Sequence, residues 1–190
     1  MRNKFWAPAL SASIFCIAFT LSAGAAQAQS AAPASYKHTL VVPIKTSTGA
    51  DAGSATFNES KNGKQLTIAV KLKGLPSGEH AVHIHQNPVC DAPAFTTAGG
   101  HFNPDSKQHG MLNPMGHHAG DMPRNISIGE YNTGEIVYKV DYLTLAPGAP
   151  NSVLGHSIMV HEKADDMMTD PTGNAGSRIA CGVIPASAAQ

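Results

Sequence analysis

Alternation of apolar and polar side chains is the clearest pattern along this chain, and it predicts β-strands. The strongest case is the run 66–73, where Leu66, Ile68, Val70 and Leu72 alternate with smaller or polar residues. Shorter apolar runs predict further strands at residues 39–44, 55–57, 79–85, 124–128, 134–145, 153–161 and 177–184. No segment carries a convincing helical period. About eight short strands therefore predict an all-β domain, built as a sandwich or as a closed barrel of antiparallel strands.

Turns and long loops separate these strands. The sequences Asp51-Ala52-Gly53 and Lys61-Asn62-Gly63-Lys64 are turn signals, and Pro43 suits an edge position. Residues 86–123 and 162–177 show neither strand nor helix periodicity. Loops of such length in a compact domain are usually either functional or disordered. The density of glycine, proline and histidine in the first loop, with a cysteine, favours a loop that is ordered by metal.

The N-terminus has the pattern of a secretory signal peptide. Arg2 and Lys4 precede an apolar run from Phe5 to about Leu21, and Ala26-Gln27-Ala28 is an A-x-A cleavage signal. The apolar run is short for a membrane span, and a retained anchor is the alternative interpretation. We therefore expect a cleaved signal peptide at residues 1–28, a flexible segment at 29–35 and one domain at 36–190.

Charge and cysteine content narrow the class of protein further. Loss of the leader lowers Lys and Arg from 13 to 11 against 13 Asp and Glu, so the mature net charge is −2. This balance gives no argument for binding to nucleic acid or to an anionic membrane after leader removal. The two cysteines that remain, Cys90 and Cys181, predict one disulfide bond in an exported protein.

Histidines gather in one part of the chain. Seven of the ten histidines lie between Gly78 and Asp121. A solvated loop has no reason to collect so many imidazoles, whereas a transition-metal site does.

The spacing of these residues indicates two sets of ligands. His83 and His85 stand at i and i+2 of a predicted strand, so both side chains point to the same face. Two such histidines need one or two more ligands, for which His101 and His161 are candidates. A looser second group is a closed set of three histidines and one carboxylate, which suits tetrahedral zinc. Its members are His101, His109, His118 and Asp121.

With these residues in this spacing, the chain resembles a copper/zinc superoxide dismutase of the exported bacterial type. The resemblance covers nearly the whole mature chain and is most specific in the runs 161–166 and 172–182. It is dense in Gly78–His85, Gly99–Pro104 with His109-Gly110, His118–Asp121, Val160–Asp166 and Thr172–Val183. The resemblance implies an eight-stranded antiparallel Greek-key barrel or sandwich with two long functional loops.

Residue roles also follow from the resemblance. It implies that copper is bound by His83, His85, His101 and His161, and that zinc is bound by His101, His109, His118 and Asp121, with His101 bridging the two metals. It further implies that Asp165 hydrogen-bonds one histidine of each set, that Arg178 stands over the open copper position, and that Cys90 pairs with Cys181. His80 is expected to brace the backbone, His117 to face solvent, and His156 is assigned no role.

The implied activity is disproportionation of superoxide to O2 and hydrogen peroxide by copper cycling between Cu(II) and Cu(I), with a structural zinc. Arg178 and His101 are the implied catalytic residues, and Lys163 is either a steering charge or a solvated loop residue. A copper-binding or copper-buffering protein without dismutase activity, and a secreted β-domain that holds zinc alone, are the rival interpretations. Export to the periplasm is expected, with extracellular space as the alternative, and the sequence leaves open whether the protein is a monomer or a homodimer.

Overall fold

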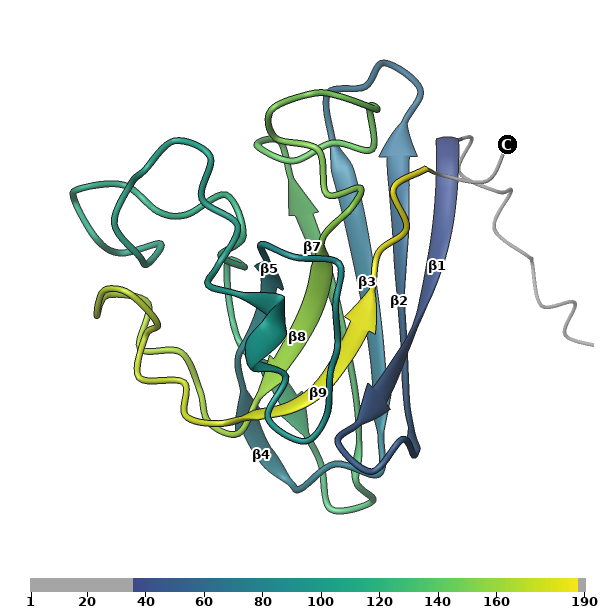
Figure 1. The fold of residues 1–190 in the computed structure, drawn as a ribbon, viewed down its shortest axis with the longest axis vertical. Helices are drawn as coiled ribbons and strands as arrows, with labels where there is room; N and C mark the ends of the chain where they lie inside the picture. Colours follow the sequence, from purple (N-terminus) through teal and green to yellow (C-terminus); the bar gives the residue numbers. More distant parts are fainter. Residues whose placement is uncertain (1–35, 188–190) are drawn as a thin grey trace, which may run out of the picture. The chain divides into compact units, whose positions relative to one another are not determined.

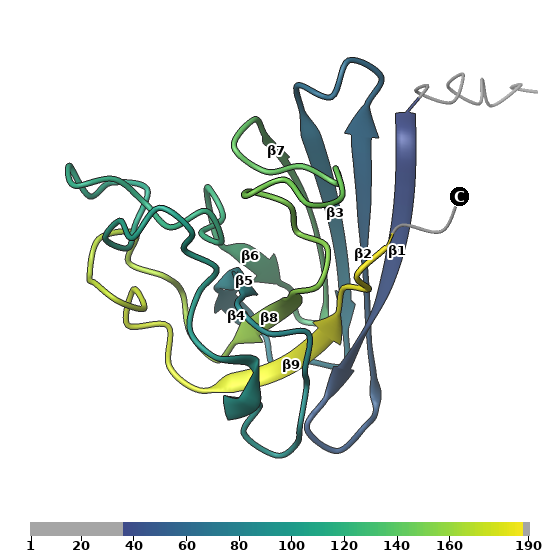
Figure 2. The same ribbon diagram turned by 45° about the horizontal axis from the view of Figure 1, so that its top comes forward.

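The computed structural model describes residues 36–187, which form nine antiparallel strands and one short 3₁₀ turn, η1 (Thr96–Ala98) (Figure 1). The strands are β1 (Tyr36–Thr46), β2 (Asp51–Ser60), β3 (Leu66–Lys73), β4 (Gly78–His80), β5 (Val82–His85), β6 (Ile126–Ile128), β7 (Thr133–Val140), β8 (Ser157–His161) and β9 (Arg178–Val183). Seven of them make one sheet in the order β5-β8-β9-β1-β2-β3-β7, and β4 pairs with β6 in a second sheet. In Figure 2, β8 and β9 run across the direction of β1–β3, so the large sheet is strongly curled. The all-β prediction is confirmed.

One of the predicted strands is divided into two strands in the structure. Residues 79–85 were expected to form a single strand, but β4 pairs with β6 whereas β5 pairs with β8. The change of partner occurs at Ala81, whose N–H donates to the Lys163 carbonyl (2.8 Å) and whose carbonyl accepts the His161 N–H (2.9 Å). The second long loop thus takes both backbone groups of Ala81 and lets the chain pass from one sheet to the other.

The predicted turn at residues 51–53 is wrong. These residues begin β2, and the turn lies just before them, closed by hydrogen bonds between Thr46 and Ala50 and between Gly49 and Thr46. A register shift pairs Ile44 with Gly53 and Lys45 with Asp51, which leaves one residue of β2 unmatched. Such a bulge accommodates turn-forming residues inside a strand, so composition alone misplaced the boundary.

The core follows from strand alternation. In β3 the buried residues are those of the predicted apolar face, and in β7 the inward residues include Tyr138 and Val140. A second, small cluster packs Phe95, Ala98, Met159 and Cys181 together under the first long loop. This small core fixes residues 86–100 against the large sheet, close to β5.

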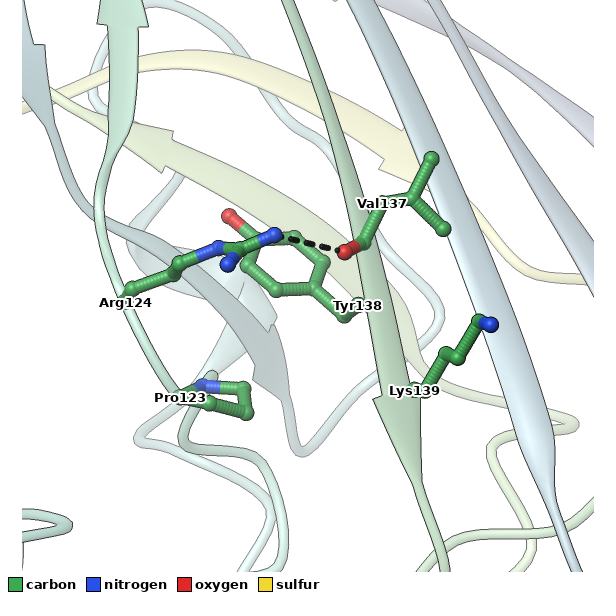
Figure 3. A pocket seen from close by; sticks show the side chains of 5 residues that line it. All are labelled: Pro123, Arg124, Val137, Tyr138 and Lys139. Atoms are coloured by element: carbon green, nitrogen blue, oxygen red, sulfur yellow. Dashed lines mark hydrogen bonds between the residues drawn. The ribbon is translucent and has the colours of Figure 1, made fainter.

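Strand β7 ends the large sheet on one side, and Arg124 closes part of its edge. The guanidinium donates to the Val137 carbonyl (3.0 Å) across the gap between the two sheets (Figure 3). Together with Pro123, Tyr138 and Lys139 these residues line a pocket of about 360 Å³. The Tyr138 hydroxyl is buried, and within residues 36–187 it has no hydrogen-bond partner.

The predicted leader and N-terminal segment, residues 1–35, lie outside the described residues. Among residues 36–187, there is no helix with the length and apolar character needed to cross a membrane.

Candidate metal centre

Four histidines from three parts of the chain meet at the side of β5. His83 and His85 come from β5 itself, His161 ends β8, and His101 is held beside His85 by an isolated β-bridge. One ring nitrogen of each lies within 4.8 Å of those of the other three, and all four residues are buried. The first predicted ligand set is therefore a real cluster.

Each ring of this cluster is anchored through one nitrogen and turns the other toward its neighbours. The anchors are the Asp165 carboxylate for His83 (2.8 Å), the Gly99 carbonyl for His85 (3.0 Å) and the Gly176 carbonyl for His161 (3.4 Å). On the inner side, Nε2 of His85 lies 3.3 Å from Nε2 of His161. His83 Nδ1 and His101 Nε2 are buried without a partner in the described structure. Inward lone pairs of this kind are what a transition-metal ion requires.

The second set meets at one carboxylate oxygen. Nδ1 of His109, His101 and His118 lie 2.9, 3.0 and 3.4 Å from Oδ1 of Asp121, and Nδ1 of His118 lies 3.3 Å from that of His101. Four ligands at about 2.0–2.1 Å from a tetrahedral ion stand about 3.3 Å from one another. The observed spacings of 2.9–3.4 Å fit such an ion.

The two sets touch each other, and His101 belongs to both. On the Asp121 side, the four residues whose ligand atoms all lie within 4.8 Å of one another are His83, His101, His109 and Asp121, and His118 is not among them. Orientation separates the two candidates. His118 directs Nδ1 at Asp121, whereas Nε2 of His83 is occupied by Asp165 and its free nitrogen lies among the buried rings of the first set.

Backbone pairing along β5 brings the loop histidines into place. The N–H of Ile84 donates to the Gly120 carbonyl (2.9 Å), and the Ile84 carbonyl accepts the Phe102 N–H (2.9 Å). A Cβ at Gly120 would overlap the Ile84 carbonyl, so this approach requires glycine. Residues from two remote parts of the first loop are thereby held at the strand that carries His83 and His85.

Burial and hydrogen bonding set the charge state of these groups. Burial, together with neighbouring His83, lowers the pKa of His101 to about 3, and burial lowers that of His85 below its ordinary range. For His109, burial acts to lower the pKa, but hydrogen bonds to Asp121 and Asp165 outweigh it and raise the pKa to about 9. Burial likewise acts to raise the pKa of Asp121, but hydrogen bonds from His101, His109 and His118 hold it far below its usual value. The neutral imidazoles of the first set and the ionised Asp121 carboxylate are forms that bind metal, whereas His109 must give up a proton when an ion binds.

Asp165 links the two sets directly. One carboxylate oxygen lies 2.8 Å from His83 Nε2, and the other lies 3.0 Å from His109 Nε2. Its backbone is held in turn by Asn125, whose side chain accepts the Asp165 N–H (2.8 Å) and donates to the Asp165 carbonyl (2.9 Å). The second long loop therefore contributes a carboxylate that orients one ring of each set.

Arg178 lines a pocket of about 420 Å³ that also contains His85, His101, His161 and Thr172. Its guanidinium donates to the carbonyls of Phe95 and Gly99, both at 2.6 Å. The same loop is joined to β9 by the Cys90–Cys181 disulfide, which confirms the predicted pairing. A fixed positive charge consequently shares one cavity with three of the four clustered histidines.

Other histidines are settled by their contacts. His80 braces the backbone as expected, with its ring nitrogens 2.8 Å from the His161 carbonyl oxygen and 2.9 Å from that of Pro76. His117 was expected to face solvent, but it is half-buried with its ring centroid 4.6 Å from that of Tyr142. The Tyr142 hydroxyl donates to the Asp121 carbonyl (2.8 Å). Sequence reasoning missed Asn125 and Tyr142, because neither lies in a motif and both contacts span remote parts of the chain.

Comparison with known proteins gives a consistent result. The family model described as copper/zinc superoxide dismutase (SODC) matches residues 51–184. The chain is 44% identical over 136 residues to superoxide dismutase (Cu-Zn) 2 of Aquifex aeolicus, covering 70% of this chain and 78% of that protein. It is 38% identical over 160 residues to the Cu-Zn superoxide dismutase of Deinococcus radiodurans, covering 78% and 85%. The crystal structure of a SOD-like protein from Bacillus subtilis matches with a TM-score of 0.71 and 35% identity, over 79% of this chain and 99% of that one.

Proposed function

The chain belongs to the copper/zinc superoxide dismutase family, and from this premise we propose how its residues carry out that family's reaction. Copper and zinc are its cofactors, and superoxide is its substrate. Two superoxide ions and two protons give one O2 and one hydrogen peroxide. The observation that carries the proposal is a buried four-histidine cluster that shares His101 with a three-histidine, one-carboxylate set and opens into the cavity of Arg178.

We assign copper to His83, His85, His101 and His161, and zinc to His101, His109, His118 and Asp121. The inward nitrogens of the first four, two of them without a partner in the described structure, support the copper assignment. Convergence of three Nδ1 atoms on Asp121 Oδ1 supports the zinc assignment. His118 rather than His83 completes the zinc set, for the orientation reasons given above.

When bound, copper supplies the one-electron Cu(II)/Cu(I) couple that the reaction needs and that zinc lacks. The protein's own contribution centres on His101. Its Nδ1 is fixed beside Asp121. Its Nε2, which faces the other copper ligands, is therefore the nitrogen that is free to take up a proton. We propose that His101 takes up a proton at Nε2 and gives it to the departing peroxide. Asp165 keeps the rings of His83 and His109 in place while this proton moves.

Arg178 is proposed to hold the substrate anion. Two carbonyl acceptors fix its guanidinium at the cavity that the copper ligands line, so little motion is needed when superoxide arrives. Positive potential inside a cleft also raises the local concentration of a small anion. Binding and orientation of superoxide are thus the work of one side chain.

We further propose that the mature chain starts at Gln29 and works in the periplasm. The leader pattern at residues 1–28 and a disulfide, which forms and persists in oxidising compartments, support this placement.

The test is the rate of superoxide decay with residues 29–190 loaded with copper and zinc. Arg178→Ala is expected to lower kcat/KM roughly 10-fold or more, with the loss shrinking at high salt. Lys64→Ala, which removes one positive charge from the exposed β2–β3 turn, is the matched control and should leave the rate unchanged. Copper bound stoichiometrically with no decay above free-metal background would reject the enzyme and leave copper binding as the function.

A further inference from the structure

Tyr142 lies far from the predicted motifs but contacts the backbone of a proposed zinc ligand. It follows β7, in the connection toward β8, and its hydroxyl donates to the Asp121 carbonyl at 2.8 Å. Its own carbonyl accepts a hydrogen bond from the Asn151 side chain (3.0 Å). The Tyr142 backbone is thus held by Asn151, and its hydroxyl contacts the first long loop.

The turn that Tyr142 touches is the one that carries two zinc ligands. Asp121 N–H donates to the His118 carbonyl (3.2 Å), which closes a four-residue turn. The same His118 carbonyl lies 2.7 Å from His117 Nδ1, so this nitrogen carries the proton. The His117 ring packs edge-on against the Tyr142 ring, with centroids 4.6 Å apart. Tyr142 therefore contacts the turn at two points, one polar and one through an aromatic ring.

The position of Asp121 matters because its carboxylate organises the whole set. One oxygen meets the three Nδ1 atoms, and the other accepts the N–H groups of Gly110 (2.9 Å) and His118 (3.0 Å). On the strand side the turn is held by the bond from Ile84 to Gly120. At the next residue of the turn, the Tyr142 hydroxyl donates to the Asp121 carbonyl. A turn whose backbone is held at two successive residues keeps the Asp121 carboxylate in position before the ion arrives.

We propose that Tyr142 is a positioning residue for zinc: its hydroxyl, with the His117 ring packed edge-on against its own ring, holds Asp121 in the geometry that zinc binding needs. This inference rests on the zinc ligand set proposed above. Groups that orient metal ligands typically change metal affinity 10- to 100-fold when they are removed. Because the Tyr142 bond is to the backbone and not to the carboxylate, the lower end of that range is expected.

Tyr142→Phe removes the hydroxyl and keeps the ring. The experiment measures the rate at which a chelator takes zinc from the full mature protein. It also measures the visible spectrum of Co(II) bound in place of zinc, which reports ligand geometry. Tyr138→Phe is the matched control, since it deletes a buried tyrosine hydroxyl that has no partner within residues 36–187. Urea unfolding of both metal-free variants measures any general loss of stability.

The expected result is zinc release about 10-fold faster in Tyr142→Phe, an altered Co(II) spectrum, and wild-type behaviour in Tyr138→Phe. Equal release rates and spectra in wild type and Tyr142→Phe would overturn the inference. Faster release with an unchanged Co(II) spectrum, matched by an equal loss of metal-free stability, would also overturn it by assigning Tyr142 a structural role alone. Failure of the wild-type protein to hold zinc would instead reject the proposed zinc site.

Discussion

Removal of the disulfide is predicted to weaken both the fold and the metal centre. Cys90 lies in the first long loop and Cys181 in β9, 91 residues further along the chain. The segment 86–100 that contains Cys90 also presents the Gly99 carbonyl, which contacts both His85 and Arg178. The double variant Cys90→Ala/Cys181→Ala avoids free thiols and releases this segment from β9.

The separation of the two cysteines sets the expected loss of stability. A cross-link that closes a loop of this length removes unfolded-state entropy equivalent to about 4–5 kcal/mol at 25 °C in the chain-entropy model. With a urea dependence of about 2 kcal/mol per molar, the unfolding midpoint of the metal-free protein should fall by about 2 M. This is a large part of the 5–15 kcal/mol that holds a typical domain together.

Urea titration of the metal-free wild type and double variant, followed by circular dichroism, measures this shift. Chelator competition on the loaded proteins measures metal retention, which should fall because the Gly99 carbonyl no longer has a fixed position. A midpoint shift below about 0.5 M would refute the entropic estimate. Copper and zinc retention equal to that of wild type would refute the idea that the disulfide tethers the site.

Two further predictions concern buried contacts. Glu59 is 2% exposed and accepts the Leu145 N–H (3.0 Å). Glu59→Ala leaves that donor unpaired and should lower the free energy of unfolding of the metal-free protein, measured by calorimetry, by about 1–3 kcal/mol. A melting temperature within about 1 °C of wild type would contradict this. Gly173 has φ +63° and lies against Asp165, where a Cβ would overlap the carboxylate. Gly173→Ala should therefore weaken zinc and copper retention at least about 10-fold. The control Gly148→Ala, at φ +75° with open space around it, should change stability alone. Equal metal retention in the two variants would contradict the role of Asp165.

Local patterns predicted much of the fold because they depend on near neighbours. Alternation in residues 66–73 identified β3, and the spacing of His83 and His85 placed both on one strand. The split at Ala81 could not be predicted, since it arises from hydrogen bonds with residues about 80 positions away. The start of β2 was missed because a bulge, rather than a turn, accommodates residues 51–53.

The candidate ligands of the metal centre were predictable from the sequence, but the residues that support them were not. Histidine and aspartate have distinctive chemistry, so their gathering was visible in the sequence, and the family resemblance supplied the sets. Tyr142 and Asn125 have no such signal, because tyrosine and asparagine are common and their contacts depend on how remote loops pack. His117 was misjudged for the same reason, since its ring packs against Tyr142, which lies in a different connection.

The Asp165 carboxylate makes the two proposed metal sites partners in a thermodynamic cycle. It touches His83 of one set and His109 of the other, so an ion in either set favours the carboxylate orientation that the other set uses. Linkage is reciprocal: the factor by which zinc tightens copper must equal the factor by which copper tightens zinc. The order in which the ions arrive can therefore change how fast the enzyme matures, but it cannot change the total binding free energy of the finished pair.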